Sequence, residues 1–427
     1  MKAAIAAAAG AFSRWRETSV ADRSSRLIAL GGAIAGRSPE LQRLITEEVS
    51  KTLRSSAAEL TKCAVYTRWL SGNASRILAA RSAGSAAHIH YEPLGVVAGI
   101  MPWNFPFWQV IRFAAAALVA GSAVVVKHSP LVPRCAEALN DVFAAAGFDR
   151  DVFFCAAGSS DDARILIADD RVRAVAFTGS SETGRQIASL AGQHLKKCIL
   201  ELGGSDAFIV MASANLEVAV HAAVESRLRA GGQACTAAKR FLVHSRIADE
   251  FEARLVEAMN AIKVGDPFDP AIDIGPLVTE TAADRLQRQV DDSIARGATV
   301  LCGAQRLGAR MYQPTVLAVR DVDLPVMQEE TFGPVAPVLR VNDIDEAVAA
   351  ANSTRYGLSA SVWTTDTAEA AALRARLDAG QVFVNCVTSS NVDLPFGGTK
   401  DSGFGRELGD AGLLEFVNVK VEVRAQC

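Results

Sequence analysis

Several features are scarce in this sequence of 427 residues. Its eight cysteines form no CxxC pair, it has only six histidines, and aromatic residues make up 6% of the chain. Lys and Arg total 44 against 47 Asp and Glu, so the formal net charge is only -3. Without clustered cysteines, neither a cysteine-based zinc site nor a compact disulfide framework is predicted. Without a basic excess, nucleic acid and anionic membranes are not expected partners.

Hydrophobic runs long enough to cross a membrane are also missing. Residues 93–111 carry no charge, but prolines and glycines break them, and the next apolar run, 113–126, is too short. The alanine-rich opening before Gly10 resembles a secretory segment only faintly, because Phe12 and Trp15 continue it as an amphipathic helix, and Glu17 and Asp22 argue against a transit peptide. We therefore expect a cytoplasmic protein with reduced cysteines.

The hydrophobic pattern changes after Gly84. Before it, from about residue 3 to 78, apolar residues recur at three- and four-residue spacing, as in amphipathic helices. After it, short β-rich runs alternate with helix-like segments. These runs span residues 96–101, 123–127, 174–178 and 207–211. The alternation predicts an α/β fold with a doubly wound parallel sheet, and a second α/β series follows from Phe241 to Phe383.

One glycine turn suits a phosphate. A predicted strand ends at Thr178 and continues into GSSETG (179–184), after which an amphipathic helix begins. Backbone N–H groups and the positive end of the helix dipole favour a pyrophosphate there. The GxxxxG spacing matches neither the dinucleotide fingerprint nor the P-loop, so an ordinary capped turn is an equally good interpretation. Lys127 ends another predicted strand and adds a cation at the same sheet edge.

Three residues elsewhere have the chemistry for acyl transfer. Cys235 follows two glycines, which open the backbone to a substrate and leave an N–H beside the sulfur for an oxyanion. Glu201 ends an apolar run before a glycine pair, where burial would suit it to act as a general base. Asn104 lies in a proline and aromatic corner. Taken singly, each has a plainer interpretation: a buried thiol, a salt-bridged strand end and an amide bound to local backbone.

Six motifs follow one another along the chain. They are PWNFP (102–106), FTGSSETG (177–184), ELGGSD (201–206), GGQACTAAKRF (231–241), EETFGPV (329–335) and PFGGTKDSGFGRE (395–407). Together they resemble the NAD(P)-dependent aldehyde dehydrogenase superfamily over essentially the whole sequence. Among subfamilies, MPWNFPFWQVIRFAA and ACTAAKRF are most similar to short-form succinate-semialdehyde dehydrogenases. The resemblance implies an aldehyde dehydrogenase-like fold, with a cofactor domain, a catalytic domain and a small oligomerisation arm.

The resemblance also implies roles for single residues. Cys235 would attack the aldehyde carbon, Asn104 would hold the oxyanion, and Glu201 would activate water to hydrolyse the thioester. The implied cofactor contacts are Trp103, Lys127, Ser129, Gly179, Ser180, Gly184, Leu202, Glu330 and Phe332. The implied substrate contacts are Arg112 and Arg229, for a distal carboxylate, with Trp108 and Ser390. No metal is implied.

One departure from the family bears on the cofactor. NAD-preferring members carry a glutamate three residues after the position of Lys127, and this chain has Pro130 there. Without a carboxylate to repel a 2′-phosphate, NADP is favoured, with NAD as the alternative. Other functions stay open: a dehydrogenase for neutral or aromatic aldehydes, a CoA-acylating relative, a cysteine hydrolase, or a non-catalytic cofactor-binding homologue. His88 and His90 are a weaker candidate, for a metal pair.

The domains are expected in three parts. They are a cofactor-binding domain (1–202) with an oligomerisation arm near 80–93, a catalytic domain (203–401), and a return segment with a terminal strand (402–427). In the tail, valines alternate with polar residues from 417 to 424, which is typical of a strand. Because no hairpin partner lies beside it, we expect it to pair with residues 87–92 across the interface of a homodimer or homotetramer.

Overall fold

A computed structural model describes residues 1–84 and 86–424 of the chain. Four helices come first, as the periodicity predicts. They are α1 (Lys2–Trp15), α2 (Val20–Gly36), α3 (Ser38–Val49) and α4 (Leu53–Ile77). Two of them have side-chain caps, since Ser19 and Thr52 accept hydrogen bonds from backbone N–H groups in the first turns of α2 and α4. No helix of the described part of the chain is long and apolar enough to cross a membrane.

The first sheet has six strands in the order β17-β7-β6-β3-β4-β5. Its strands are β3 (Val96–Met101), β4 (Ala123–His128), β5 (Phe153–Ala157), β6 (Val172–Thr178), β7 (Lys197–Glu201) and β17 (Gly403–Phe404). All neighbours pair in parallel except β17, which runs antiparallel to β7. The apolar runs at 96–101, 123–127 and 174–178 are thus confirmed as strands.

Helices cover both faces of this sheet, so its strands are apolar on both sides. The covering helices are α5 (Trp108–Ala120), α6 (Pro133–Ala145), α7 (Ser160–Ala168) and α8 (Ser181–Gln193), together with α1–α4. Val97 and Val124 belong to the core beneath α2–α6, whereas Ala98 and Val125 belong to the core beneath α1, α7 and α8. Alternate residues therefore enter opposite cores.

The second sheet has seven strands in the order β10-β11-β12-β9-β8-β14-β15. Its strands are β8 (Asp206–Val210), β9 (Ala238–His244), β10 (Thr299–Cys302), β11 (Thr315–Val319), β12 (Val335–Val341), β14 (Ser359–Trp363) and β15 (Gln381–Val384). The helices around it are α9 (Leu216–Arg227), α10 (Ser245–Asn260), α11 (Glu280–Ala295), α12 (Pro325–Gln328), α13 (Ile344–Asn352) and α14 (Thr367–Arg376). The second α/β series predicted from Phe241 to Phe383 is confirmed in outline. The run at 207–211, expected with the first series, is β8 and belongs to this second sheet instead, because it pairs with β9 and β14.

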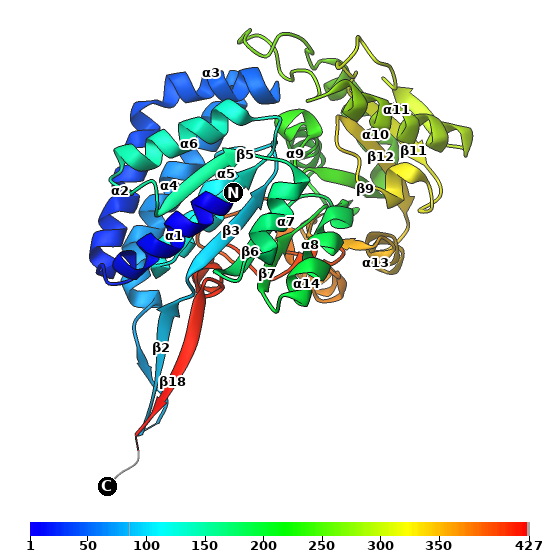
Figure 1. Cartoon of the computed structure of the whole chain (residues 1–427). Coiled ribbons are helices and arrows are strands. Elements are labelled where there is room, and N and C mark those ends of the chain that lie inside the picture. The colour runs from blue at the N-terminus through cyan, green and yellow to red at the C-terminus, as the bar shows by residue number, and fades with distance from the viewer. Residues whose placement is uncertain (85, 425–427) are drawn as a thin grey trace.

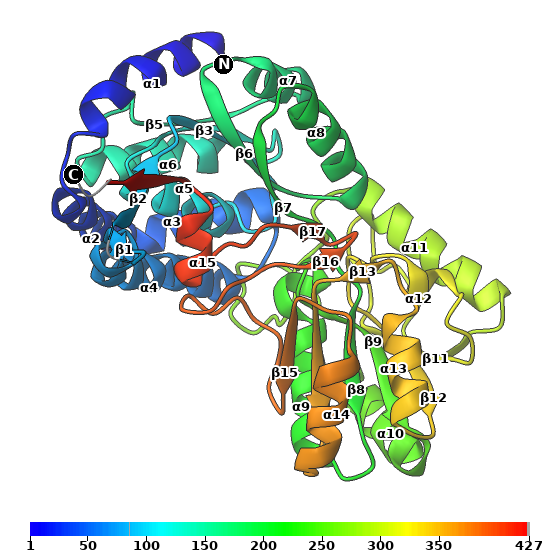
Figure 2. The same ribbon diagram turned by 90° about the horizontal axis from the view of Figure 1, so that it is seen from below.

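The return segment connects the two sheets. Its elements are β16 (Thr399–Lys400), which pairs with β13 (Tyr356–Gly357), then β17, then α15 (Gly409–Leu414). The Ser402 hydroxyl donates to the carbonyl of Gly203 at 2.6 Å and accepts from the N–H of Gly357 at 3.0 Å. Figure 2 shows β16 and β17 between the two sheets. The carboxyl end of β7 is therefore enclosed by chain that follows just over 200 residues later.

A slender arm projects from the body of the molecule (Figure 1). It consists of β1 (Arg81–Ser82), β2 (Ala87–Pro93) and β18 (Val417–Val423), with β2 in the middle. The tail pairs with the segment we expected, from Val417 opposite Pro93 to Val423 opposite Ala87. The pairing expected across a subunit interface is made within one chain instead, because the return segment brings the tail back to β2. Residues 425–427 of the predicted tail lie outside the described residues.

Candidate active site

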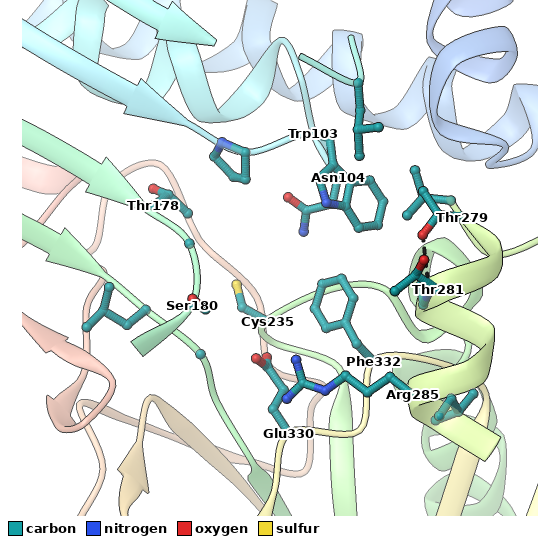
Figure 3. Close-up of a pocket in the computed structure, with 18 of the residues that line it drawn as sticks. Trp103, Asn104, Thr178, Ser180, Cys235, Thr279, Thr281, Arg285, Glu330 and Phe332 are labelled. Atoms are coloured by element: carbon teal, nitrogen blue, oxygen red, sulfur yellow. Dashed lines mark hydrogen bonds between the residues drawn. The ribbon is translucent and has the colours of Figure 1, made fainter. Parts of the chain in front are cut away.

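Cys235 lies where two cavities meet. One cavity of about 420 Å³, the Phe332 cavity, is lined by Trp103, Asn104, Glu330, Phe332 and neighbouring residues. The other, of about 300 Å³, is the Arg229 cavity, and its wall includes Lys62, Trp108, Arg112, Arg229 and Ser390. Cys235 belongs to both walls. In Figure 3 its sulfur points into the Phe332 cavity, between Ser180 and Phe332.

The backbone before Cys235 is unusual. A short 3-10 helix, η1 (Arg229–Gly232), contains Ala230 at φ 51°, Gly231 at 66° and Gly232 at 80°, all in the left-handed region. A Cβ at position 232 would lie 2.4 Å from the backbone of Gly333, so only glycine fits there. This close approach places the following turn, with Cys235, beside the segment that carries Glu330 and Phe332.

Burial raises the pKa of the Cys235 thiol to about 11, and the cations of Lys239 and Arg112 oppose the shift. The Lys239 ammonium donates to the carbonyl oxygen of Cys235 at 2.6 Å and lies 3.5 Å from a carboxylate oxygen of Glu330. The thiol is therefore mostly protonated near neutral pH in the ligand-free site.

Asn104 faces the same cavity. Its side-chain NH2 donates to the carbonyl of Gln233 at 3.0 Å, which leaves one of its two N–H bonds for another acceptor. The corner that carries Asn104 is held by Lys51, just before α4, which donates to the Asn104 carbonyl at 3.1 Å and is ion-paired with Glu59 of α4. Sequence reasoning missed Lys51 and Glu59, because the backbone groups that they bind in the Asn104 corner lie about 50 residues further along the chain.

Glu201 ends β7 and is buried. Among the described residues, neither of its carboxylate oxygens has a hydrogen-bond partner. Burial raises the pKa of this carboxyl well above its usual range, the Arg112 guanidinium opposes the shift, and Glu407 adds to it. A buried carboxylate left without donors is costly for folding and is common at functional sites.

A long groove of about 1000 Å³, the Lys127 groove, follows the carboxyl ends of the first sheet. Lys127, Ser129, Gly179 and Ser180 line it, and Trp103, Gly179 and Ser180 also line the Phe332 cavity. A continuous path therefore leads from Lys127 to Cys235. Ser180 caps α8 by accepting from the Thr183 N–H at 3.2 Å. This path suits an extended dinucleotide, with its phosphates at the glycine turn and the start of α8.

The other predicted cofactor residues fall into two groups. Phe332 packs edge-on against Trp103 at 5.9 Å between ring centroids, and the Glu330 carboxylate accepts from the Gly204 N–H at 3.2 Å. Both line the Phe332 cavity with Leu202. Gly184 lines neither the groove nor this cavity. A Cβ at position 184 would lie 2.5 Å from the Leu202 side chain, so this glycine allows α8 to pack closely.

One wall of the Phe332 cavity was not predicted. It comes from α11 and the turn before it, with Thr279, Thr281 and Arg285 (Figure 3). These residues follow Cys235 by more than 40 positions and carry no motif, so nothing in the sequence indicated them.

The Arg229 cavity contains both predicted arginines, in different surroundings. The Arg112 guanidinium is buried, ion-paired with Glu407 and 4.9 Å from the Phe396 ring centroid. Arg229 donates to the Thr388 carbonyl at 2.6 Å, and among the described residues it forms no ion pair. The charge of Arg229 is therefore available to a ligand, whereas that of Arg112 is already balanced.

The histidine pair has no metal-like surroundings. His88 and His90 lie on β2, and His90 contacts a carboxylate oxygen of Glu422 at 2.9 Å. Within residues 1–84 and 86–424, no group of three or more His, Cys, Asp or Glu side chains is arranged to hold a metal ion.

Comparison with known proteins agrees with this geometry. The model of the aldehyde dehydrogenase family matches residues 1–421. The chain is 44% identical over 426 residues to a succinate-semialdehyde dehydrogenase (NADP+) of Mycobacterium tuberculosis strain H37Rv, covering 98% of this chain and 93% of the relative. An enzyme of the same name from Mycobacterium avium strain 104 is 45% identical over 427 residues, covering 98% and 90%.

Solved structures agree as well. Succinic semialdehyde dehydrogenase from Streptococcus pyogenes in complex with NADP+ superposes with a TM-score of 0.96 at 30% identity, covering 100% of this chain and 95% of the other. An NADP-dependent enzyme of E. coli gives 0.96 at 34% identity, covering 99% and 89%. The likeness spans both sheets and the arm, so the chain belongs to the aldehyde dehydrogenase family.

Proposed function

We propose that this enzyme oxidises a short aldehyde with a carboxylate at its far end, succinate semialdehyde above all, to the acid with NADP. The observation that carries the proposal is the position of Cys235 between two cavities, one reached from the Lys127 groove and one containing the unpaired cation of Arg229. The names of the mycobacterial relatives support the same substrate.

The first step belongs to Cys235. Its thiol first loses its proton to solvent; the thiolate then attacks the aldehyde carbon and forms a thiohemiacetal, whose oxyanion is held by the Asn104 amide and the Cys235 N–H. One such donor is worth about 3 kcal/mol of barrier. Lys51 and Glu59 act on this step indirectly, because they fix the corner from which Asn104 reaches the site.

The second step releases the acid. A nicotinamide held by Trp103, Glu330 and Phe332 would supply the acceptor for the hydride that the substrate carbon loses. Glu201 then takes a proton from the water that attacks the resulting thioester, which is worth about 10²- to 10⁴-fold in rate. Both oxygens of its buried carboxylate, which accept no hydrogen bond from the described residues, are available to that water. Cys235 leaves as the thiolate, and the product is a carboxylate.

The cofactor assignment rests on the Lys127 groove. Lys127 and Ser129 line it, and Pro130 follows them where a carboxylate would repel a 2′-phosphate. The NADP+ complex of the Streptococcus pyogenes relative supports this preference. NAD is the alternative. We place the cofactor on the predicted 1–202 domain and the nucleophile on the 203–401 domain.

We also propose a cytoplasmic homodimer or homotetramer. All seven cysteines that the structure describes are free thiols, which suits a reducing compartment. The arm leaves Val419, Val421 and Val423 more than half exposed, so a second copy would bury them.

A steady-state assay tests the proposed activity. The enzyme is mixed with NADP or NAD and either succinate semialdehyde or butanal, and absorbance of the reduced cofactor is followed. We expect the highest kcat/KM for succinate semialdehyde with NADP. In Arg229→Met, KM should rise far more for succinate semialdehyde than for butanal, because only the former has a carboxylate. Equal preference for both aldehydes in the unmodified enzyme would favour the neutral-aldehyde alternative.

A further inference from the structure

We propose that Lys62 is a second cation, beside Arg229, that binds the distal carboxylate of the substrate and sets the preference for it. The inference rests on the proposed function and goes one residue further. Lys62 lies on α4, far from every motif, and it lines the Arg229 cavity that ends at Cys235.

The contacts of Lys62 hold its ammonium at the cavity wall. The Nζ atom donates to the hydroxyl of Ser390, which comes from the chain after β15, and lies 4.6 Å from the ring centroid of Trp108 on α5. Both partners are neutral. An aromatic face and a hydroxyl orient an ammonium without cancelling its charge.

The charges around Lys62 favour an anion in this cavity. The carboxylate nearest on its own helix, Glu59, is paired with Lys51, and Glu407 is paired with Arg112. In the described part of the chain, Lys62 and Arg229 form no ion pair. A cavity of about 300 Å³ is thus lined by two cations that form no ion pair there and by the thiol of Cys235. Such an arrangement suits a molecule with an aldehyde at one end and a carboxylate at the other.

The same surroundings make the Lys62 charge sensitive to pH. Burial, with the neighbouring cations Arg112 and Arg229, lowers the pKa of Lys62 to about 7, and the thiols of Cys63 and Cys235 oppose the shift only weakly. In the free enzyme Lys62 is charged below pH 7 and loses its charge above it. Preference for the carboxylated aldehyde should therefore fall as pH rises through about 7.

The experiment measures a ratio of kcat/KM values, succinate semialdehyde over butanal, with saturating NADP between pH 6 and 9. Ionisations of Cys235 and Glu201 affect both aldehydes and cancel in the ratio. We expect the ratio to decline through pH 7 in the unmodified enzyme. In Lys62→Met it should be about 10- to 100-fold lower at pH 6 and nearly independent of pH, as expected for the loss of a charged hydrogen bond.

Two further variants separate charge from structure. Lys62→Gln keeps a donor for Ser390 without the charge and should behave like Lys62→Met. Lys62→Arg keeps a charge at all pH values tested and should retain the ratio at pH 9. Thermal unfolding is the folding control: because the ammonium is uncompensated, Lys62→Met should unfold at the same or a higher temperature.

The outcomes distinguish the two proposals. If the unmodified enzyme does not prefer succinate semialdehyde, the substrate assignment is wrong. A different result would refute the role of Lys62 alone. The unmodified enzyme would prefer succinate semialdehyde and Arg229→Met would lose that preference, but Lys62→Met and Lys62→Gln would keep both the preference and its pH dependence. A fall in melting temperature in Lys62→Met, with both aldehydes slowed equally, would also refute this role and leave Lys62 as a structural residue.

Discussion

At the scale of single residues, burial disfavours the charged form of both Cys235 and Glu201 in the free enzyme. The proposed reaction nevertheless needs each of them as an anion at one step. The cations of Lys239 and Arg112 oppose the pKa shift at Cys235, and those of Arg112 and Arg406 oppose it at Glu201. The thiolate is the reactive form of a cysteine, so a protonated thiol is protected from oxidation and alkylation. Cys235 is therefore expected to react faster as the pH rises.

The first prediction concerns the thiol. Alkylation of ligand-free enzyme by iodoacetamide should accelerate about tenfold for each pH unit between 7 and 10, because the thiolate fraction grows below a pKa of about 11. Mass spectrometry of the Cys235 peptide measures the rate, and Cys235→Ser is the control for labelling at other thiols. A rate that levels off by pH 8 would contradict the raised pKa.

The second prediction concerns the base. Glu201→Gln should give a burst of reduced cofactor equal to the number of active sites, followed by turnover about 10²- to 10⁴-fold slower, because only thioester hydrolysis needs the carboxylate. Stopped-flow absorbance resolves the two phases. Glu217→Gln, an exposed change in the first turn of α9, is the matched control. Absence of the burst would mean that Glu201 acts before hydride transfer.

At the scale of elements, α4 supports both cavities. Glu59 accepts hydrogen bonds from the backbone N–H groups of Phe107 and Trp108 at 2.8 and 2.9 Å, where α5 begins, and it pairs with Lys51. An anion at the start of a helix satisfies free donors and the helix dipole. The same helix presents Lys62 one turn later. A single helix thus positions the oxyanion corner and part of the substrate cavity.

The third prediction tests this support. Glu59→Leu and Lys51→Met should each lower the free energy of unfolding by about 3 to 5 kcal/mol, since each leaves a buried charge unpaired. The double variant should be less destabilised than the sum of the single variants. Urea unfolding measures all three. Additive losses would show that the two side chains do not act as a pair.

At the scale of the whole molecule, the reactive centre lies between two sheets. The chain passes from the first sheet to the second and then returns to the first. The Lys127 groove belongs to the first sheet, Cys235 to the second, and the return segment encloses Glu201. The arm stands apart from this body, and its valines Val419, Val421 and Val423 remain exposed in the single chain. They are the surface on which the proposed oligomer depends.

The fourth prediction concerns that surface. Val419, Val421 and Val423 are 56%, 62% and 72% exposed, and changing Val419 and Val421 to lysine should convert the proposed oligomer to a smaller species. Light scattering at micromolar concentration measures the mass. Lys420→Gln on the same strand is the control. A monomeric unmodified enzyme would rule out the oligomer.

Most of the helices and strands of the fold could be predicted from local sequence. The apolar runs at 96–101 and 123–127 became β3 and β4, because parallel strands covered on both faces are continuously apolar. Pairings between distant residues could not be predicted in this way. The Lys62 contact with Ser390 spans 328 positions, and the ion pair of Arg112 with Glu407 nearly 300. In both pairs, the sequence around one residue gives no indication of which residue it contacts.

The antiparallel pairing of β17 with β7 has a consequence for synthesis on the ribosome. Gly403 and Phe404 cover the edge that ends at Glu201, and they are translated only after the whole second sheet. Until then, β7 is an exposed edge strand of the nascent first sheet, and its unpaired backbone groups can pair with strands of other chains. Chains that end before Gly403 would lack β17 and have an incomplete first sheet. We expect such fragments to aggregate or to be degraded.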